Sequence, residues 1–552
     1  MIETIEIKIN KKKYTYNKDV CLYEIAKDFK EEFRYPIVLA RVGNRLRELS
    51  YSLKESCSIE FLDLTSREGN NTHINGLVYV MVYAVKKLYG KQANIIVEHS
   101  LDKGIYIEST FKLNEEKVKA IKNKMVDIIK EDKPIIKTNI DRMEAMKYFE
   151  SVGDEAKAGV MRYSTNNYVT LYRLGNLYNY FYNLMPTSTG LVKDFDLTYI
   201  KDNGFILRFP TMFIPDKIKK YEHHPMMFEV FKQYRDWGKK LGISTSVDLN
   251  RIVSTGKVSD MIKVDSTVYN HRILTIAKDI SEKVKDIKVV LLAGPSSAGK
   301  TTTSKKLCMY FSLFGLNPKV LSMDNYFKER EDTPLNPDGT HDYECLEALD
   351  LKLFDKQIEK LLKGEEIFIP TFNFTFGKKE YNEKMQLDEN DILVIEGIHA
   401  LDNKILTNIQ RNKKYKIYIS TLTEVNVDDH NRISTTDNRL LRRIIRDNRT
   451  RGHSVEDTLA AWQSVRNGEE LYVFPFQDDS DVTINSAATY ELGVLKTYVE
   501  PLLYSVETTS PYYEEAKRLI DFLKLFLPIP SDAIPEDAVL REFIGGSYFN
   551  VD

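Results

Sequence analysis

Hydrophobic and polar residues alternate with different periods along this chain, and these periods predict its elements. At the start, alternation over 5–9 and again over 14–16, with a lysine-rich turn between them, predicts a β-hairpin. The amphipathic stretch 22–29 predicts a short helix, and strands are expected over 37–42 and 58–62. This order predicts a small α+β module at the start of the chain.

A second α+β region is expected to follow. Its pattern predicts a helix over 72–88, strands over 95–100 and 104–106, a helix from 114, an extended stretch from 132 and a helix near 144–149. The adjacent pair His223–His224 lies in a loop and is expected to face solvent rather than to bind a metal. Residues 226–268 show helical and loop patterns to which we assign no role, and we treat them as a connection.

The second half has the pattern of an open α/β domain. The apolar run 287–293 predicts a buried strand, and 301–314 predicts a helix that ends at Gly315. Apolar runs over 319–323 and 391–395 predict two further buried strands. Ligands of such sheets bind outside the carboxyl ends of the strands, so the residues that follow these runs are candidates for chemistry.

A glycine-rich loop with the spacing G-x-x-x-x-G-K-[ST] follows the first of these strands. A strand, this loop and a helix form a phosphate cradle, in which Lys300 reaches the β- and γ-phosphates and Thr301 can hold Mg²⁺. A chance match in a glycine turn is the alternative, and the flanking strand and helix argue against it. We predict a nucleotide site at Gly294, Pro295, Ser296, Ser297, Ala298, Gly299, Lys300, Thr301 and Thr302.

Two acidic residues stand at the ends of the neighbouring predicted strands. Asp324 follows the second strand, where it can orient a substrate hydroxyl and accept its proton. Glu396 follows the third strand, where it can hold Mg²⁺ opposite Thr301. An Asx-turn at Asp324 and a plain turn after a buried strand at Glu396 are the structural alternatives.

One predicted helix and its exit are crowded with arginine: Arg439, Arg442, Arg443, Arg446, Arg449 and Arg451. At helical spacing Arg439, Arg442 and Arg446 share a face, and Arg443 turns aside. A basic helix can be a solvated or salt-bridged stripe, or it can close as a lid over the charge that develops during phosphoryl transfer. Because guanidinium groups bind phosphate bidentately, we favour the lid.

Composition limits the remaining classes of function. At 552 residues the chain is expected to contain several domains, and its net charge of -2 gives no global basic excess for nucleic acid, so any RNA contact would be local. The 4 cysteines lack C-x-x-C spacing, which argues against a disulfide framework or a thiolate metal site. No apolar run is long enough to cross a bilayer. We therefore expect a cytoplasmic protein.

The motifs of residues 287–503, and their order along the chain, resemble those of the uridine kinase branch of the phosphoribulokinase and uridine kinase family. Besides the phosphate loop, they are Ser322–Phe327, Tyr343–Glu344, Ile369–Phe374, Ile395–Leu401 and Leu441–Asp447. The resemblance implies a five-stranded parallel sheet, ATP and Mg²⁺ as cofactors, and transfer of the γ-phosphoryl group to the 5′-hydroxyl of a pyrimidine nucleoside.

The resemblance also implies roles for individual residues. Asp324 becomes the catalytic base beside Lys300, Glu396 the metal-side acid, and Arg442, Arg446 and Arg451 the lid cations. By the same resemblance, Tyr343 and Phe374 line the nucleoside pocket and Glu344 lies near the ribose hydroxyls. Independently of the family, the aromatic residues could stack on a base as part of a substrate pocket or could form simple core; they are Tyr326, Phe327, Tyr343, Phe372 and Phe374. Because Phe372 and Gly377 stand where the family has a tyrosine and a histidine, the acceptor stays open between uridine, a related ribonucleoside and another small alcohol such as a sugar phosphate.

The N-terminal half resembles two modules of threonyl-tRNA synthetase, the β-grasp TGS domain and the editing-like second additional domain. That second domain opens on two histidines four residues apart, whereas here His73 is followed by Leu77, so metal or editing chemistry is expected to be absent. An RNA-binding regulatory NTPase is the alternative function, and a homo-oligomer stays open.

The complete architecture resembles bacterial nucleoside kinases, including the tail 540–547. The predicted domains are 1–64 (TGS-like), 65–270 (synthetase-like region and linker), 271–510 (P-loop kinase) and 511–552 (helical extension and tail).

Overall fold

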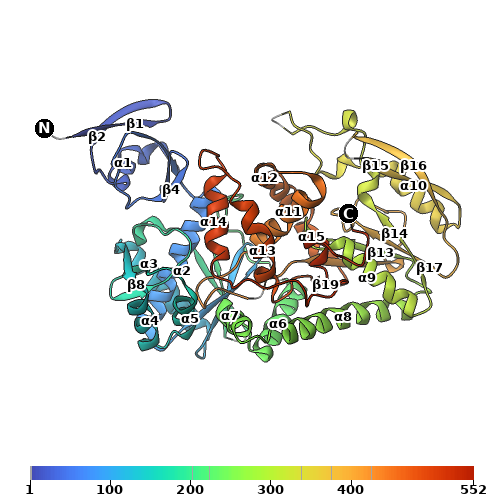
Figure 1. Ribbon diagram of the computed structural model, residues 1–552, viewed down its shortest axis with the longest axis horizontal. Helices are drawn as coiled ribbons and strands as arrows, with labels where there is room; N and C mark the ends of the chain where they lie inside the picture. The colour runs from blue at the N-terminus through green and yellow to red at the C-terminus, as the bar shows by residue number, and fades with distance from the viewer. Residues whose placement is uncertain are drawn as a thin grey trace.

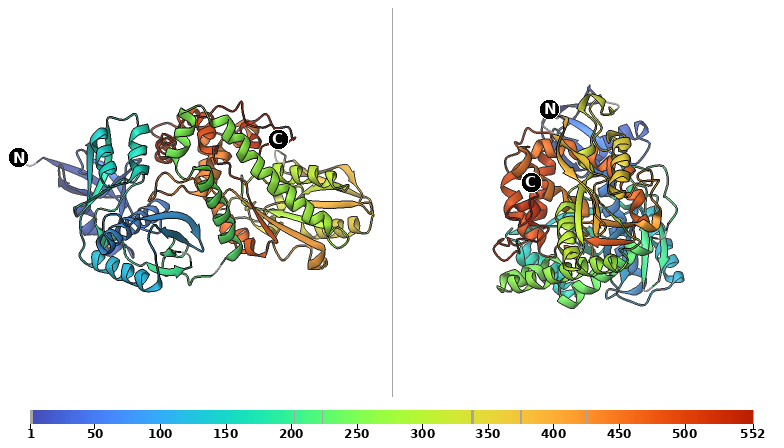
Figure 2. Two further views of the ribbon diagram at one scale, coloured as in Figure 1. Left: turned by 90° about the horizontal axis from the view of Figure 1, so that it is seen from below. Right: turned by 90° about the vertical axis from the view of Figure 1, so that its right-hand side faces the viewer.

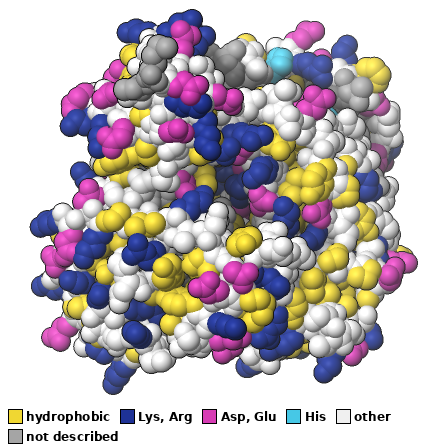
Figure 3. Space-filling view, turned by 60° about the vertical axis from the view of Figure 1, so that its left-hand side comes forward, with side chains coloured by type: hydrophobic (Ala, Val, Ile, Leu, Met, Phe, Trp, Pro, Cys, Tyr) yellow, Lys and Arg dark blue, Asp and Glu magenta, His cyan; other side chains and the backbone are white. Residues whose placement is uncertain are grey.

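The computed structural model describes residues 3–201, 203–222, 224–336, 339–373, 376–423 and 425–551. The N-terminal module lies at one end of the molecule, the P-loop domain at the other, and the C-terminal helices between them (Figure 1). Basic and acidic side chains are interspersed on the face shown in Figure 3, in keeping with the near-neutral net charge. Among the described helices, none combines the length and the hydropathy needed to cross a membrane.

The N-terminal module is a mixed five-stranded sheet with one helix packed against it. The strands, in the spatial order β2-β1-β5-β3-β4, are β1 (Thr4–Ile9), β2 (Lys12–Asn17), β3 (Leu39–Val42), β4 (Arg45–Glu48) and β5 (Cys57–Leu62). β1 and β5 are parallel, and the other pairs are antiparallel. Helix α1 (Leu22–Phe29) has the bounds predicted, and its apolar face shares a core with the alternating isoleucines of β1.

Two antiparallel sheets follow, in the orders β11-β12-β7-β6 and β10-β9-β8. Their elements are α2 (Arg67–Tyr89), β6 (Ile95–Leu101), β7 (Gly104–Ser109), α3 (Glu115–Lys130), β8 (Ile135–Asp141), α4 (Arg142–Ser151), α5 (Glu155–Tyr163), β9 (Tyr168–Leu174), β10 (Leu177–Asn179), β11 (Asp196–Ile200) and β12 (Gly204–Arg208). All residues from Leu77 to Val85 in α2 are buried, so this helix forms the centre of the region.

The stretch to which the sequence assigned no role consists largely of helices. These are α6 (Pro225–Leu241), α7 (Ser246–Ser254) and α8 (Val258–Glu282). Helix α8 runs along the P-loop domain (Figure 2), where Ile273, Ile276 and Ile280 share a core with strand β13 and helix α9. The long helix therefore covers one face of the parallel sheet.

The P-loop domain contains the five-stranded parallel sheet that the family resemblance implied. Its strand order is β14-β17-β13-β18-β19, and every neighbouring pair is parallel. The elements are β13 (Val289–Ala293), α9 (Lys300–Leu313), β14 (Asn317–Ser322), α10 (Leu351–Leu362), β17 (Asp391–Glu396), β18 (Lys414–Ser420) and β19 (Val482–Asn485), with a separate hairpin of β15 (Ile367–Asn373) and β16 (Lys378–Met385).

The C-terminal helices do not form an independent appendage. They are α11 (Thr435–Arg451), α12 (Val455–Tyr472), α13 (Glu491–Leu503), α14 (Tyr513–Leu523) and α15 (Arg541–Ile544). Apolar residues of these helices share one core with residues of α4, α5 and α7, so the predicted division near residue 270 does not separate two hydrophobic cores. Short 3-10 helices lie at Lys30–Glu32, Thr189–Leu191, Met323–Tyr326, Arg330–Asp332, Leu346–Ala348, Arg411–Lys413 and Phe474–Asp479.

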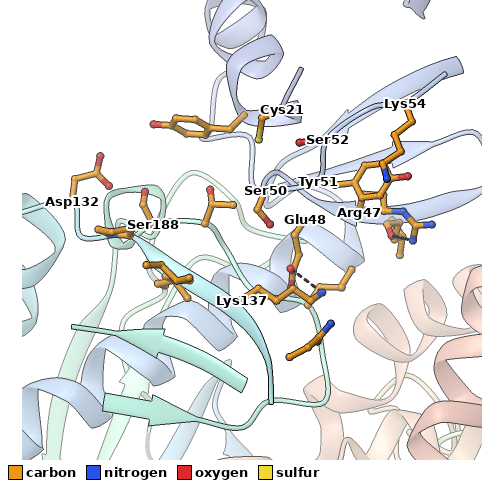
Figure 4. A pocket seen from close by; sticks show the side chains of 18 residues that line it. Cys21, Arg47, Glu48, Ser50, Tyr51, Ser52, Lys54, Asp132, Lys137 and Ser188 are labelled. Carbon is orange, nitrogen blue, oxygen red and sulfur yellow. Dashed lines mark hydrogen bonds and ion pairs between the residues drawn. The ribbon is translucent and has the colours of Figure 1, made fainter. Parts of the chain in front are cut away.

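A cavity of about 880 Å³ lies between the N-terminal module and strand β8 (Figure 4). Glu48, 5% exposed, accepts hydrogen bonds from the Tyr172 hydroxyl (2.5 Å) and the Met185 N–H (3.0 Å), and it forms an ion pair with Lys137 (3.0 Å). The charge of this carboxylate is thus matched within the fold. Glu48 therefore fastens the N-terminal module to the region that follows it.

Candidate active site

Strands β13, β14 and β17 end side by side at one edge of the parallel sheet. In the register of the sheet, Glu396 pairs with Leu292 of β13 and with Ser322 of β14. The phosphate loop follows β13, and Asp324 follows β14. The carboxyl of Glu396 interacts electrostatically with Asp324 and Lys300. The fold thus brings together the three residues that the strand pattern placed at this edge.

The phosphate loop (residues 294–301) has the tight backbone that a phosphate cradle requires. Ser297 and Gly299 have positive φ angles of 61° and 82°. A β-carbon at Gly294 would come within 2.1 Å of the Ile419 carbonyl oxygen, so only glycine fits there. The loop is therefore held close to the sheet.

Helix α9 begins directly after this loop. The Nζ of Lys300 donates to the carbonyl oxygens of Gly294 and Pro295, at 3.1 and 3.3 Å. Thr301 is only partly buried in the first turn of the helix, where backbone N–H groups have no partner within the helix. An ammonium, a hydroxyl and the positive end of a helix dipole consequently face one crevice.

Arg439 and Glu469 hold the phosphate loop from behind. The two side chains form a bidentate ion pair in which both are almost completely buried. Arg439 also donates to the Ser296 carbonyl oxygen (3.1 Å), and Glu469 accepts from the Ser296 N–H (3.1 Å). One buried pair therefore satisfies both backbone groups of a loop residue, which fixes the loop before any ligand arrives.

The structure corrects the expectation that Arg442 is a lid cation. Its side chain is 0% exposed and forms a bidentate pair with the equally buried Glu491. The guanidinium also donates to the Ser297 carbonyl oxygen (3.3 Å) and to the Ser486 carbonyl oxygen (2.9 Å). Helical spacing predicted a face shared with Arg446 but could not show that this part of α11 faces the core. Arg442 is a structural support of the phosphate loop.

A different set of arginines faces the crevice. Arg443, Arg446 and Arg451 surround the buried carboxylate of Asp447, at 3.1, 2.8 and 3.6 Å. Arg443, expected to turn aside, donates to the hydroxyl of Ser296 in the phosphate loop (2.9 Å). Because three guanidinium groups share one carboxylate, this corner carries an excess of positive charge beside the loop.

Two carboxyl groups in the crevice have strongly raised pKa values. Burial, and after it the charge of Asp324, raises the pKa of Glu396 to about 7. Burial also raises the pKa of Glu344 to about 7, although Arg443 acts in the opposite direction. Within the described part of the chain, neither carboxyl forms an ion pair with a lysine or arginine. Carboxyl groups in this state are typical of sites that bind a cation or a hydroxyl.

Phe327, three residues after Asp324, belongs to an aromatic cluster with Tyr343 and Phe372. The Phe327 ring lies 6.0 Å from the Tyr343 ring and 5.7 Å from the Phe372 ring, between ring centres. Phe327 and Phe372 are buried, and Tyr343 is partly exposed. Of the three rings, the partly exposed Tyr343 is the one on which a nucleobase can stack, with Phe327 and Phe372 packed behind it in the core.

The other two aromatic residues expected in the pocket do not join this cluster. Tyr326 is 0% exposed and packs edge-on against Phe354, and its hydroxyl donates to Gln357 at 2.7 Å. Its prediction as a substrate residue is wrong, because the 3-10 turn after β14 points it into the core. Phe374 lies outside the described residues.

The sequence did not predict that a distant carboxylate reaches the phosphate loop. Glu542 of α15 accepts hydrogen bonds from the Thr302 N–H (3.1 Å) and the Thr302 hydroxyl (2.7 Å), and both residues are buried. The tail had been noted as a motif, but no local pattern shows which residue 240 positions away it contacts. This carboxylate belongs to the candidate site.

Two histidines of the N-terminal half, His73 and His224, differ in their surroundings. His73 is buried in α2, and burial lowers its pKa to about 4. His224 contacts Asp102 and lies with it and Glu222 in a group that could surround a cation, but Lys219 already pairs with both carboxylates. His224, expected to face solvent, is thus only partly exposed and also contacts Asp478, and His223 lies outside the described residues.

The chain is similar to known kinases over this domain. Residues 289–492 match the family model "Phosphoribulokinase / Uridine kinase family". The chain is 25% identical to a uridine kinase of Staphylococcus haemolyticus over 207 residues, which are 37% of this chain and 91% of that protein. It is 27% identical to a uridine kinase of Anoxybacillus flavithermus over 197 residues, which are 36% of this chain and 84% of that protein.

Among solved structures, phosphoribulokinase from Rhodobacter spheroides is 14% identical, with a TM-score of 0.25, over 36% of this chain and 70% of that chain. The family match lies in the C-terminal half, so the TGS-like and synthetase-like character of the N-terminal half stays a prediction. The C-terminal half therefore contains a P-loop kinase domain similar to this family, and the similarity indicates a phosphotransferase.

Proposed function

We propose that this protein is an ATP-dependent kinase that transfers the γ-phosphoryl group to the 5′-hydroxyl of uridine or a related ribonucleoside. The observation that carries the proposal is the meeting of Lys300, Asp324 and Glu396 at one edge of the parallel sheet. A phosphate-binding ammonium, a carboxylate exposed to the crevice and a buried carboxyl beside it are the groups that phosphoryl transfer requires.

The groups present fit ATP and Mg²⁺. The first turn of α9 offers N–H donors to the phosphates, and the arginines around Asp447 add positive charge beside them. The Thr301 hydroxyl and the Glu396 carboxylate are hard oxygen donors of the kind that Mg²⁺ prefers. When bound, Mg²⁺ supplies neutralisation of the charge that develops on the phosphoryl oxygens.

The residues of the crevice have different roles in an in-line phosphoryl transfer. Asp324 accepts the proton of the acceptor hydroxyl while the hydroxyl oxygen bonds to the γ-phosphorus. The bond from that phosphorus to the bridging oxygen breaks, and ADP leaves. Arg443 and Lys300 stabilise the negative charge on the transferring group because they contact the phosphate loop. Arg446 adds positive charge beside them, since it shares the Asp447 carboxylate with Arg443.

The acceptor end of the crevice favours a nucleoside. The partly exposed ring of Tyr343, supported by Phe327 and Phe372, can stack on a base, and Glu344 can accept hydrogen bonds from ribose hydroxyls. A sugar phosphate would make no use of the Tyr343 ring.

A panel of acceptors with labelled ATP tests the function. We expect label transfer to a ribonucleoside, and a loss on the order of 10² or more in kcat for Asp324→Asn while binding of a non-hydrolysable ATP analogue persists. Lys300→Ala should weaken both binding and turnover. Transfer to a sugar phosphate alone would change the acceptor, and near-normal turnover of Asp324→Asn would remove this residue from the mechanism.

A further inference from the structure

The C-terminal segment, residues 538–546, folds onto the phosphate loop. A β-carbon at Gly299 would lie only 2.3 Å from the Cγ1 of Val539, which places this segment in direct contact with the loop. Val539 and Leu540 are buried there. The segment therefore covers the place where the loop turns into α9, which is where a phosphate cradle must be open.

Glu542 is the residue of this segment that enters the cradle. Its carboxylate accepts from both the N–H and the hydroxyl of Thr302, in the first turn of α9. Donors at this position of a phosphate loop cradle the α- and β-phosphates of a nucleotide. A carboxylate and a phosphate oxygen would accept hydrogen bonds from the same donors, and two anions cannot occupy this position at once.

The segment is attached by contacts that hold it in this position. Arg449 donates to the carbonyl oxygens of Phe543 (3.1 Å) and Glu542 (2.9 Å), and the Phe543 ring packs 4.8 Å from the guanidinium of Arg442. Gly545 and Gly546 then have φ angles of 91° and 69°, which reverse the chain after α15. Short helix α15 thus presents Glu542 to the loop from a segment near the end of the chain.

We propose that residues 538–546 are a tethered competitor of the nucleotide, with Glu542 occupying the α-phosphate position until ATP displaces it. This rests on the proposed function, because it takes the nucleotide to bind at the phosphate loop. The tether keeps the carboxylate at the cradle, so the apparent affinity for ATP falls by the fraction of molecules in which the cradle is open. The C-terminal segment thus acts as an internal inhibitor of nucleotide binding.

The test is the binding of a non-hydrolysable ATP analogue with Mg²⁺ to the full chain, measured by titration calorimetry. Glu542→Gln keeps the size of the side chain and removes its charge, so we expect at least tenfold tighter binding than in the wild type. Glu536→Gln is the matched control, since Glu536 is an exposed acid on the approach to the same segment, and we expect wild-type affinity. Thermal unfolding of each variant checks that the fold is kept.

Hydrogen exchange of the wild-type chain gives a second readout. Amides of 538–546 should exchange faster when the analogue is bound, because displacement releases the segment. Equal or weaker binding by Glu542→Gln, or slower exchange of the segment, would overturn the competitor while leaving the kinase proposal intact. If neither the wild type nor Glu542→Gln binds the analogue, the nucleotide site itself fails, and both proposals fail with it.

Discussion

Two groups of buried or partly buried carboxyl side chains lie within the P-loop domain, and they differ in what surrounds them. Glu469 and Glu491, behind the phosphate loop, each form a bidentate pair with a buried arginine. Glu396 and Glu344, in front of the loop, have no such partner among the described residues, and burial raises their pKa values to about 7. All four lie close to the phosphate loop or its crevice.

The difference shows that burial alone does not identify a functional carboxylate here. A matched pair compensates the cost of removing charge from water and holds the loop in place. A buried carboxyl group without an ion-pair partner retains the desolvation penalty of its charged form. Such groups are found at binding sites, where a ligand or a cation supplies the opposite charge. The rear of the loop is therefore built for rigidity and the front for binding.

The largest effect is expected from breaking a matched pair. Arg442→Ala leaves Glu491 as an uncompensated buried charge and should lower the free energy of unfolding by about 3–5 kcal/mol. Arg446→Ala, on a partly exposed side chain of the same helix, should cost about 1 kcal/mol or less. Denaturant unfolding measures both. Equal losses of stability in the two variants would contradict the division of α11 into a structural face and a crevice-facing side.

An unmatched carboxyl should show the opposite balance between stability and activity. Glu396→Gln removes a buried charge without leaving a partner unpaired, so we expect an unchanged or higher free energy of unfolding and a loss of about 10² in kcat. Phosphoryl-transfer assays over a range of Mg²⁺ concentrations, together with unfolding curves, measure the two quantities. A large loss of stability with normal turnover would place Glu396 with the structural group.

The smallest effect is expected in the pH dependence of stability. The pKa of Glu344 is raised from 4.5 to about 7, so the folded state binds this proton more tightly than the unfolded state. The contribution to stability is full below pH 4.5 and is lost as the pH rises to about 7. In Glu344→Gln this loss should disappear. The full shift corresponds to about 3 kcal/mol, and solvent screening of the partly exposed side chain reduces it, so the stability of the variant relative to the wild type should rise by about 1–2 kcal/mol between pH 4.5 and pH 8. Parallel thermal unfolding at both pH values is the measurement, and a constant difference would refute the assignment.

Local patterns predicted much of the fold because they report which faces of each element are apolar. The helix at 22–29 and the strand before the phosphate loop were found within two residues of their observed bounds. Strand β4 was not predicted, because Arg45-Leu-Arg-Glu48 offers one hydrophobic residue and forms a strand only through its pairing with β3. Of the C-terminal helices, only the arginine helix and a helical extension after residue 510 were predicted. Their shared core was not predicted, since packing between distant segments leaves no local period.

Local patterns also predicted part of the candidate site. Lys300, Asp324 and Glu396 follow apolar runs, and parallel strands end at one edge of a sheet, so spacing alone brought them together. Arginine spacing identified the helix but assigned Arg442 and Arg443 to the wrong sides. Which side of a helix faces the core depends on what packs against it, and no residue of α11 itself carries that information.

The sequence by itself thus determined the phosphate loop, the acids at the strand ends and the class of domain that contains them. Only the tertiary structure decided which arginines are matched, which carboxyl groups stay unmatched, and that Glu542 reaches Thr302. The physical reason is the separation along the sequence over which each interaction acts. Backbone geometry and hydrophobic period act over a few residues, whereas charge pairing and burial depend on atoms that the chain brings together from hundreds of residues apart.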